Sequence, residues 1–369
     1  MVADPIKSVT VETPASVPSP SVIDAAKAKA KQSGREVESP SLNTENMTTV
    51  ARPDGKAVGT YTYLTPIRFK NSAGDWQQID TTLVKDGDFV RPKSVKADVR
   101  LSAGGDTTLM SLKADQGDVQ VSAPAKLPHP VLSGNTATYA NAYGHGLDLE
   151  IQTTLAGIRQ KIVIRQRPSG PLTFRVPIRA SRGLEYREKA NRVEVLDDSK
   201  KIADIIPALM LDAKASQSIT QGRFSSVDTK LDGSTLVYSP DAAFLADPGT
   251  TYPVTLAGNP TPWYGAGFPS DTFISNDSRF TVGGAQQYMD AIIAGRNNFD
   301  GATSTYYIYR SYLRYDLTGA PWYGLPIINA DVRPWNYITT HCGGAEQTPE
   351  MVVRRVISDW ALNEVISEK

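Results

Sequence analysis

The feature that most constrains the fold is a succession of short β-type runs separated by turn residues, which begins near residue 55. Leu147-Asp-Leu-Glu-Ile151, Gln160-Lys-Ile-Val-Ile-Arg165 and Arg192-Val-Glu-Val-Leu196 are typical, because apolar residues alternate with polar ones. Such runs recur every ~8–12 residues with Gly, Asp, Asn or Pro between them, a spacing typical of antiparallel sandwiches and not of βαβ units. We therefore expect a mainly β fold built of tandem antiparallel β-sandwich modules.

A hairpin is predicted near the start of this region. Pro66-Ile-Arg-Phe-Lys70 alternates with period two, Asn71-Ser-Ala-Gly74 supplies turn residues, and Trp76-Gln-Gln-Ile79 begins a second strand. Two β-type runs joined by a short segment that contains Gly indicate a hairpin.

Composition divides the 369 residues into segments. Residues 1–50 are rich in Pro, Ser and Ala, and we expect a flexible leader. Ser21 is placed to cap a short helix over Ala25–Lys31, and Gly34 to end it. The Ala and Lys face of this helix is too weakly apolar to predict firm docking.

Three further segments follow the leader. Residues 51–257 are predicted to form the β-sandwich region, either as one unit or as two subdomains that divide near residue 125. Residues 258–269 are a linker rich in Pro, Gly and aromatic residues, and residues 270–369 begin a new domain. The strongest strand signal of that domain is Tyr306–Tyr315.

Charge and cysteine content exclude some classes of protein. The chain has 39 basic and 39 acidic residues without a Lys/Arg stripe, which argues against nucleic-acid and anionic-membrane partners. No apolar stretch reaches the ~18 residues of a transmembrane helix, and Met1–Pro5 lacks the features of a secretory signal. Cys342 is the single cysteine, so it is either a buried thiol or the partner of a cysteine elsewhere.

Three motifs in the last domain carry a resemblance. They are Asp271-Thr-Phe-Ile274, Arg310-Ser-Tyr-Leu-Arg-Tyr-Asp-Leu317 and Ala330-Asp-Val-Arg-Pro-Trp-Asn-Tyr337. In this order and spacing they resemble the DNRLRE-type domain, a jelly-roll relative of carbohydrate-binding modules, although Tyr315 and Val332 replace the usual Phe and Leu. The resemblance implies a jelly roll over 270–369 that is incomplete at its C-terminal end.

The preceding region extends the resemblance to roughly residues 40–369. Gly74-Asp-Trp-Gln-Gln-Ile-Asp80, Tyr139–Asp148, Gly157–Ile164 and Pro240–Pro248 are similar to segments of actinobacterial secreted proteins. In those proteins this region precedes a DNRLRE domain and often RHS (YD) repeats that end in a variable toxin, as in wall-associated polymorphic toxins. The resemblance implies an extracellular or cell-wall location and downstream domains of the same polypeptide.

Catalytic patterns are weak in this sequence. His341 and Cys342 are adjacent, so on a strand their side chains point to opposite faces and cannot form a nucleophile–base pair. No G-x-S-x-G elbow accompanies the three histidines, and no H-E-x-x-H motif indicates a metal centre. We therefore expect no enzyme activity.

Glycan binding is the function class that the last domain favours. Sugar sites combine aromatic faces with polar side chains that reach hydroxyl groups. Along Tyr306–Tyr315, the face with Tyr307 and Tyr309 is predicted to be core and the other face to be the ligand candidate. The candidate glycan-binding residues are Tyr306, Arg310, Tyr312, Arg314 and Trp322. Because Arg310 belongs to the pattern shared by the DNRLRE-type family, a fold-stabilising ion pair stays open as its role.

A structural calcium ion is the one cofactor considered. Carboxylate and amide oxygens suit Ca²⁺, and the two loops that offer them contain Asn276, Asp277, Asn298 and Asp300. The same residue types form ordinary turns, which the pattern favours over calcium.

Together these features predict a non-catalytic, secreted scaffold or adhesion segment of a larger RHS, polymorphic-toxin-like protein. Its expected partners are cell-wall or extracellular polysaccharide. The alternative is a set of accessory carbohydrate-binding modules of a secreted polysaccharide-degrading enzyme.

Overall fold

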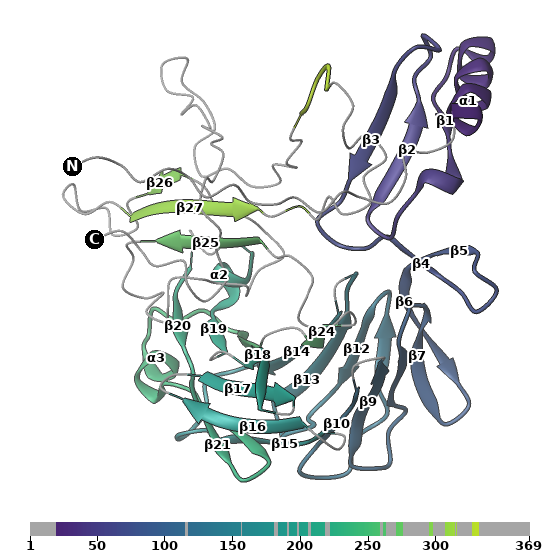
Figure 1. The fold of residues 1–369 in the computed structure, drawn as a ribbon. Coiled ribbons are helices and arrows are strands. Elements are labelled where there is room, and N and C mark those ends of the chain that lie inside the picture. Colours follow the sequence, from purple (N-terminus) through teal and green to yellow (C-terminus); the bar gives the residue numbers. More distant parts are fainter. Residues whose placement is uncertain are drawn as a thin grey trace. The chain divides into compact units, whose positions relative to one another are not determined.

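The computed structural model describes residues 20–114, 117–155, 157–180, 184–189, 192–197, 199–205, 208–217, 222–258, 261–262, 271–275, 295–297, 307–313, 315 and 327–331. The chain divides into two compact units, Met1–Arg68 with Tyr315–Trp335 and Phe69–Arg314 with Asn336–Lys369. The described elements are mainly antiparallel strands, which confirms the predicted fold class (Figure 1).

The first unit contains one helix and a small sheet. Its elements are α1 (Pro20–Ser33), β1 (Val37–Glu38), the 3-10 turn η1 (Pro40–Leu42), β2 (Met47–Ala51) and β3 (Val58–Thr62). The strands pair antiparallel in the order β1-β2-β3.

Helix α1 is longer than predicted and is docked. It spans Pro20–Ser33 and thus begins before the expected cap at Ser21. Gly34 ends it, as expected: its φ is +64° and its N–H group donates to Ala30 O at 2.9 Å. Ala26 and Ala30 lie one turn apart and are buried in one cluster with Ala51 of β2. Residues 20–50 therefore do not form the expected flexible leader, because small alanine side chains let the helix lie close to the sheet; residues 1–19 lie outside the described residues.

The predicted hairpin is present. Strand β4 (Arg68–Lys70) pairs with β5 (Trp76–Gln78). In the turn between them, Asn71 Oδ1 accepts the N–H groups of Ala73 and Asp75 at 3.0 Å each. Gly74 has a φ of +86°, a conformation that side chains disfavour, so the turn needs glycine at this position.

The second unit contains two large antiparallel sheets. The first has the order β21-β22-β15-β10-β9-β8-β7-β6. Its strands are β6 (Asp80–Asp86), β7 (Phe89–Ser94), β8 (Asp98–Ser102), β9 (Thr108–Ala114), β10 (Gly117–Ser122), β15 (Phe174–Ala180), β21 (Asp228–Asp232) and β22 (Thr235–Ser239).

The second sheet has the order β11-β12-β13-β14-β23-β19-β20, and β24 pairs with β14 beside this path. Its strands are β11 (Val131–Ser133), β12 (Thr136–Tyr139), β13 (Leu147–Thr153), β14 (Gly157–Ile164), β19 (Leu209–Leu211), β20 (Phe224–Ser226), β23 (Val254–Ala257) and β24 (Thr261–Pro262).

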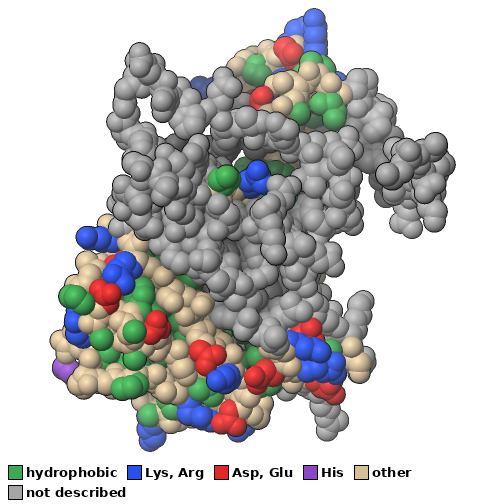
Figure 2. Space-filling view, turned by 90° about the vertical axis from the view of Figure 1, so that its left-hand side faces the viewer, with side chains coloured by type: hydrophobic (Ala, Val, Ile, Leu, Met, Phe, Trp, Pro, Cys, Tyr) green, Lys and Arg blue, Asp and Glu red, His purple; other side chains and the backbone are tan. Residues whose placement is uncertain are grey.

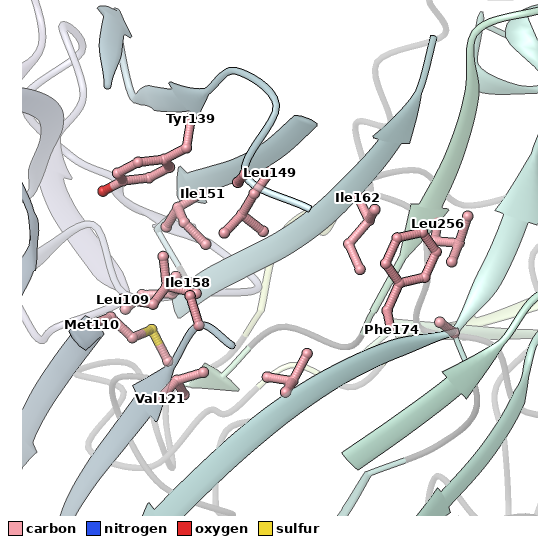
Figure 3. Close-up of a cluster of buried hydrophobic side chains, with 14 of the residues drawn as sticks. Leu109, Met110, Val121, Tyr139, Leu149, Ile151, Ile158, Ile162, Phe174 and Leu256 are labelled. Carbon is pink, nitrogen blue, oxygen red and sulfur yellow. The ribbon is translucent and has the colours of Figure 1, made fainter. Parts of the chain in front are cut away.

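One apolar core joins the two sheets. Side chains from both sheets point into the space between them (Figure 3). Across the second sheet, the strand register places one inward row side by side, formed by Tyr139, Leu149, Ile162, Leu256 and Met210. All five are at most 3% exposed. The alternation seen in the sequence thus becomes one inward apolar face per sheet, as in a β-sandwich.

The sandwich is continuous across residue 125. Strand β10, which precedes this point, pairs with β15, which follows it. Hydrogen bonds also link strand β6 of the first sheet to the second sheet: Thr153 Oγ1 donates to Thr81 O at 2.6 Å, and Leu83 N donates to Gly134 O at 2.8 Å.

Between β15 and β19 the chain forms a separate three-stranded meander. It consists of β16 (Leu184–Lys189), β17 (Arg192–Asp197) and β18 (Lys200–Ile205). Val193 of β17 is fully buried in the sandwich core, and Glu188 accepts the backbone N–H of Leu231 on β21. Two short helices, α2 (Ala213–Gln217) and α3 (Ala242–Ala246), lie in the connections that follow.

The last described sheet has the order β25-β27-β26 and is antiparallel throughout. Its strands are β25 (Asp271–Ser275), β26 (Gly295–Asn297) and β27 (Tyr307–Leu313). Two of them coincide with the strands predicted at 271–274 and 306–315. Most of residues 270–369 lie outside the described residues, so the jelly roll stays a prediction.

Candidate functional site

Strand β27 carries the two predicted glycan-binding residues that the structure describes, Arg310 and Tyr312. It is the central strand of its sheet and pairs with β25 on one side and β26 on the other. In this register Arg310 lies opposite Ile274 and Tyr312 lies opposite Thr272. Strand β26 pairs only with Tyr307–Tyr309, so at Arg310 and Tyr312 the strand is paired on one edge, with β25.

The exposure of the strand alternates along its length. Tyr309 is 3% exposed, whereas its neighbour Ile308 is 42% exposed and Arg310 is also exposed. Tyr312 shares the Arg310 face by strand parity and is half-buried. The face that carries Arg310 is therefore the open one, and an arginine and a tyrosine lie two residues apart on it.

The other predicted site residues cannot be placed beside this pair. Tyr306, Arg314 and Trp322 lie outside the described residues. The four calcium candidates, Asn276, Asp277, Asn298 and Asp300, lie outside them too, as do His341 and Cys342. Within the described ranges, no group of three or more His, Cys, Asp or Glu side chains is arranged to hold a metal ion.

The fold brings a serine, an aspartate and a histidine into one loop region that sequence reasoning did not single out. Ser102 Oγ donates to Asp106 Oδ1 at 2.9 Å and accepts the N–H of Gly104 at 3.0 Å. His129 Nδ1 lies 2.6 Å from Ala103 O. A catalytic serine donates to the histidine, which in turn contacts the carboxylate. Here the serine is bonded to the aspartate and the histidine to the backbone, so the cluster holds a loop rather than performing acyl transfer.

Asp212 is a buried carboxylate that ties three segments together. It is 1% exposed and accepts hydrogen bonds from Ala215 N at 2.8 Å, Arg223 N at 3.1 Å and Thr251 Oγ1 at 2.7 Å. A Cβ atom on Gly222 would lie 2.3 Å from Asp212 Oδ1, so only glycine fits there. These bonds from the chain itself let Asp212 cap helix α2.

A second acidic group, Asp247, ends helix α3. Arg223 donates to both of its oxygens, at 3.1 and 2.8 Å, and Gly249 N donates at 2.7 Å. The Gly249 N–H bond and the positive charge of Arg223 lower the pKa of Asp247 from its ordinary value. Asp247 lies in the Pro240–Pro248 segment, and these contacts give it a structural role.

Three tyrosines add a polar element to the sandwich: Tyr139 is buried in the core, and Tyr143 and Tyr238 are half-buried and pack against it. Burial raises the pKa of Tyr238 from 10.0 to about 12, and it also raises the pKa of Tyr139 and Tyr143. Tyr139 is fully buried and donates to Ser102 O at 2.7 Å, while the ring of Tyr143 lies edge-on to Phe174 at 5.2 Å. The Tyr139 hydroxyl therefore acts as a structural donor in the core.

Charges of both signs lie on the described surface. On the face shown in Figure 2, basic and acidic side chains are interspersed and form no single-sign patch. No helix in the described part of the chain is long and apolar enough to cross a membrane. Comparisons with protein-family models, curated proteins and solved structures found no match to this chain.

Proposed function

We propose that this chain is a non-catalytic scaffold segment of a larger secreted or wall-associated protein, and that the open face of β27 binds a polysaccharide. One observation carries the proposal: exposed Arg310 lies two residues from half-buried Tyr312, on the face opposite buried Tyr309.

The chemistry of this face suits a sugar. The rim of a pyranose ring carries hydroxyl groups that accept hydrogen bonds from a guanidinium, and its apolar face packs on an aromatic ring. Residues i and i+2 of a strand lie about 7 Å apart on one face, which lets Arg310 and Tyr312 contact one or two neighbouring sugar units. A flat, open strand face suits a polymer chain better than a small free ligand.

The test is a glycan array probed with the full chain, followed by titration of the best polysaccharide with variants. We expect Arg310→Ala and Tyr312→Ala each to weaken binding by roughly tenfold or more, a typical cost of removing a central contact. Arg100→Ala is the matched control, because Arg100 is also an exposed arginine on a strand, with its guanidinium over the ring of Phe89 at 4.7 Å.

Two results would overturn the proposal. One is the absence of binding to any polysaccharide at millimolar sugar concentration. The other is binding that Arg310→Ala and Tyr312→Ala leave unchanged, or that Arg100→Ala weakens equally. The scaffold role is tested by the coding sequence that continues the gene: YD repeats support it, and a hydrolase domain supports accessory modules of a polysaccharide-degrading enzyme.

A further inference from the structure

The first unit carries a group of polar side chains on the face of its sheet that lies opposite helix α1. Ala51 of β2 packs against α1. Strand parity turns Gly59 and Tyr61 of β3 to the other face, and Arg52 contacts both of them there. Glu36, from the segment before β1, bonds to Arg52. We call Glu36, Arg52 and Tyr61 the polar triad.

Hydrogen bonds fix the three members of the triad relative to one another. Arg52 Nη1 donates to Glu36 Oε1 and also to the Tyr61 hydroxyl, at 3.4 Å. The Tyr61 hydroxyl donates to the Glu36 carboxylate and lies 3.1 and 2.9 Å from its two oxygens. The guanidinium carbon of Arg52 is 5.6 Å from the centre of the Tyr61 ring. The triad is therefore held in one arrangement before any ligand binds.

Gly59 makes room for the guanidinium of the triad. A Cβ atom at this position would lie 2.7 Å from Arg52 Nε and 2.8 Å from Arg52 Nη2. The guanidinium thus rests directly on the backbone of β3, and any side chain at residue 59 would displace it. Glycine inside a strand weakens the strand and is typical of places where another group approaches the backbone closely.

Stability alone does not account for this arrangement. The side chains of Arg52 and Glu36 are 39% and 34% exposed, and exposed ion pairs contribute little to stability. The glycine that accommodates the guanidinium weakens its strand by a similar amount. Groups that break a local rule without a gain in stability are expected at functional sites, so the triad is a candidate for ligand binding.

The chemistry of the triad suits an uncharged sugar. The charges of Arg52 and Glu36 cancel, so the triad favours neither an anion nor a cation. A sugar hydroxyl both donates and accepts. Within the described part of the chain, Arg52 Nε and Nη2 make no hydrogen bond, and the two oxygens of Glu36 can accept more bonds than they receive. The Tyr61 ring adds an apolar surface against which a pyranose can pack.

We propose that the polar triad is a second polysaccharide-binding site of this chain, selective for uncharged sugar units. It is separate from the face of β27 that carries Arg310, and it stands whether or not that face binds a sugar. Where both sites bind one polymer, the second contact becomes intramolecular, and the apparent affinity rises without any new contact.

The test is isothermal titration of the full chain with three neutral polymers (dextran, mannan and xylan) and with anionic polygalacturonate. All proteins carry Arg310→Ala, so that β27 does not contribute. We expect binding to at least one neutral polymer, and Arg52→Met and Tyr61→Ala should each weaken it by about tenfold. Gly59→Ala should weaken it as well, yet leave the melting temperature no lower, because alanine suits a strand better than glycine. Gly170→Ala, where a Cβ atom meets nothing within 4 Å, is the matched control.

The Gly59→Ala variant separates a binding role from a structural one. A clear fall in its melting temperature would assign Gly59 and the triad to the stability of the first unit and overturn the proposal. Binding as tight as that of Gly170→Ala would do the same. The absence of binding to all three neutral polymers would also overturn it, as would tighter binding to polygalacturonate than to any of them.

Discussion

The first unit of the chain, here called the N-terminal unit, and the sandwich are stabilised by different kinds of interaction. The described interior of the N-terminal unit combines a few apolar side chains, such as Met47 and Val50, with buried polar ones, of which Arg68 is the most enclosed charge at 3% exposure. The sandwich instead rests on a continuous apolar core that draws on both large sheets. Small units bury too little apolar surface to rely on it alone, so hydrogen bonds to buried polar groups carry a larger share of their specificity.

The polar interior of the N-terminal unit is well connected. Arg68 donates to Met47 O at 2.8 Å and to Thr48 Oγ1 at 2.5 Å. Asn43 donates to Glu38 Oε1 at 2.6 Å and accepts from Thr49 N at 2.9 Å. Loss of apolar packing should therefore destabilise the sandwich most, and loss of hydrogen bonds should destabilise the N-terminal unit most.

The largest effect is expected from a cavity in the sandwich. Phe174 is 2% exposed, and Phe174→Ala should lower the free energy of unfolding of the sandwich by about 3–5 kcal/mol through lost burial and the void left behind. Urea unfolding measures the loss, with the denaturant slope unchanged. Val131→Ala, at a site 68% exposed, is the control and should change stability by less than about 0.5 kcal/mol. A loss below about 1 kcal/mol for Phe174→Ala would contradict the single-core description.

Much of the sandwich is predictable from the sequence because its strands are local patterns. The runs at 147–151, 160–165, 192–196 and 235–238 lie on strands of the structure with ends shifted by a few residues. Strand pairing is a different matter. Strand β14 pairs with β23 although some ninety residues separate them, and no alternation of polar and apolar residues encodes which strand lies next to which.

In the candidate site, too, local features are predictable from the sequence and contacts between distant segments are not. Parity along 306–315 predicts which residues share a face, and the low exposure of Tyr309 beside exposed Arg310 follows that alternation. Asp212 contacts Thr251, and His129 contacts Ala103, across segments far apart in the chain, so these neighbours emerge only in the fold. The docking of α1 was missed because two alanines carry little hydrophobic signal, although their small size permits close packing.

The second-largest loss of stability is expected from removing a buried polar group in the sandwich unit. Asp212→Ala should cost about 2–3 kcal/mol, because it leaves the N–H groups of Ala215 and Arg223 and the Thr251 hydroxyl without their acceptor. Asp212→Asn keeps one acceptor oxygen and should cost clearly less. Thermal unfolding of both variants shows which of them loses more stability. Equal losses would mean that the negative charge, and not the hydrogen bonds, holds α2.

A smaller loss is expected in the N-terminal unit from Arg68→Met. This variant keeps most of the side-chain volume but removes the donors to Met47 O and Thr48 Oγ1, and should cost about 1–2 kcal/mol. Hydrogen exchange in β2 and β3 should rise while β13 and β14 keep their protection. Arg100→Met, at an exposed arginine, is the control. Faster hydrogen exchange in the sandwich strands as well would show that the two regions unfold together and are not stabilised separately.

The last test uses pH and concerns the sandwich alone. Burial raises the pKa of Tyr238 in the folded sandwich to about 12 from 10.0. Below pH 10 the hydroxyl is protonated in both states, so its full contribution to stability is present. As the pH rises from 10 to 12, the tyrosine of the unfolded chain ionises first, and the sandwich loses stability.

Tyr238→Phe removes this group, so the urea midpoint of the variant should fall less steeply over that range than the midpoint of the unaltered protein. The difference between the two proteins at pH 8 corrects for packing, because neither form is ionised there. Parallel declines would mean that Tyr238 ionises as readily in the folded sandwich as in the unfolded chain, and that its hydroxyl is not enclosed by the core.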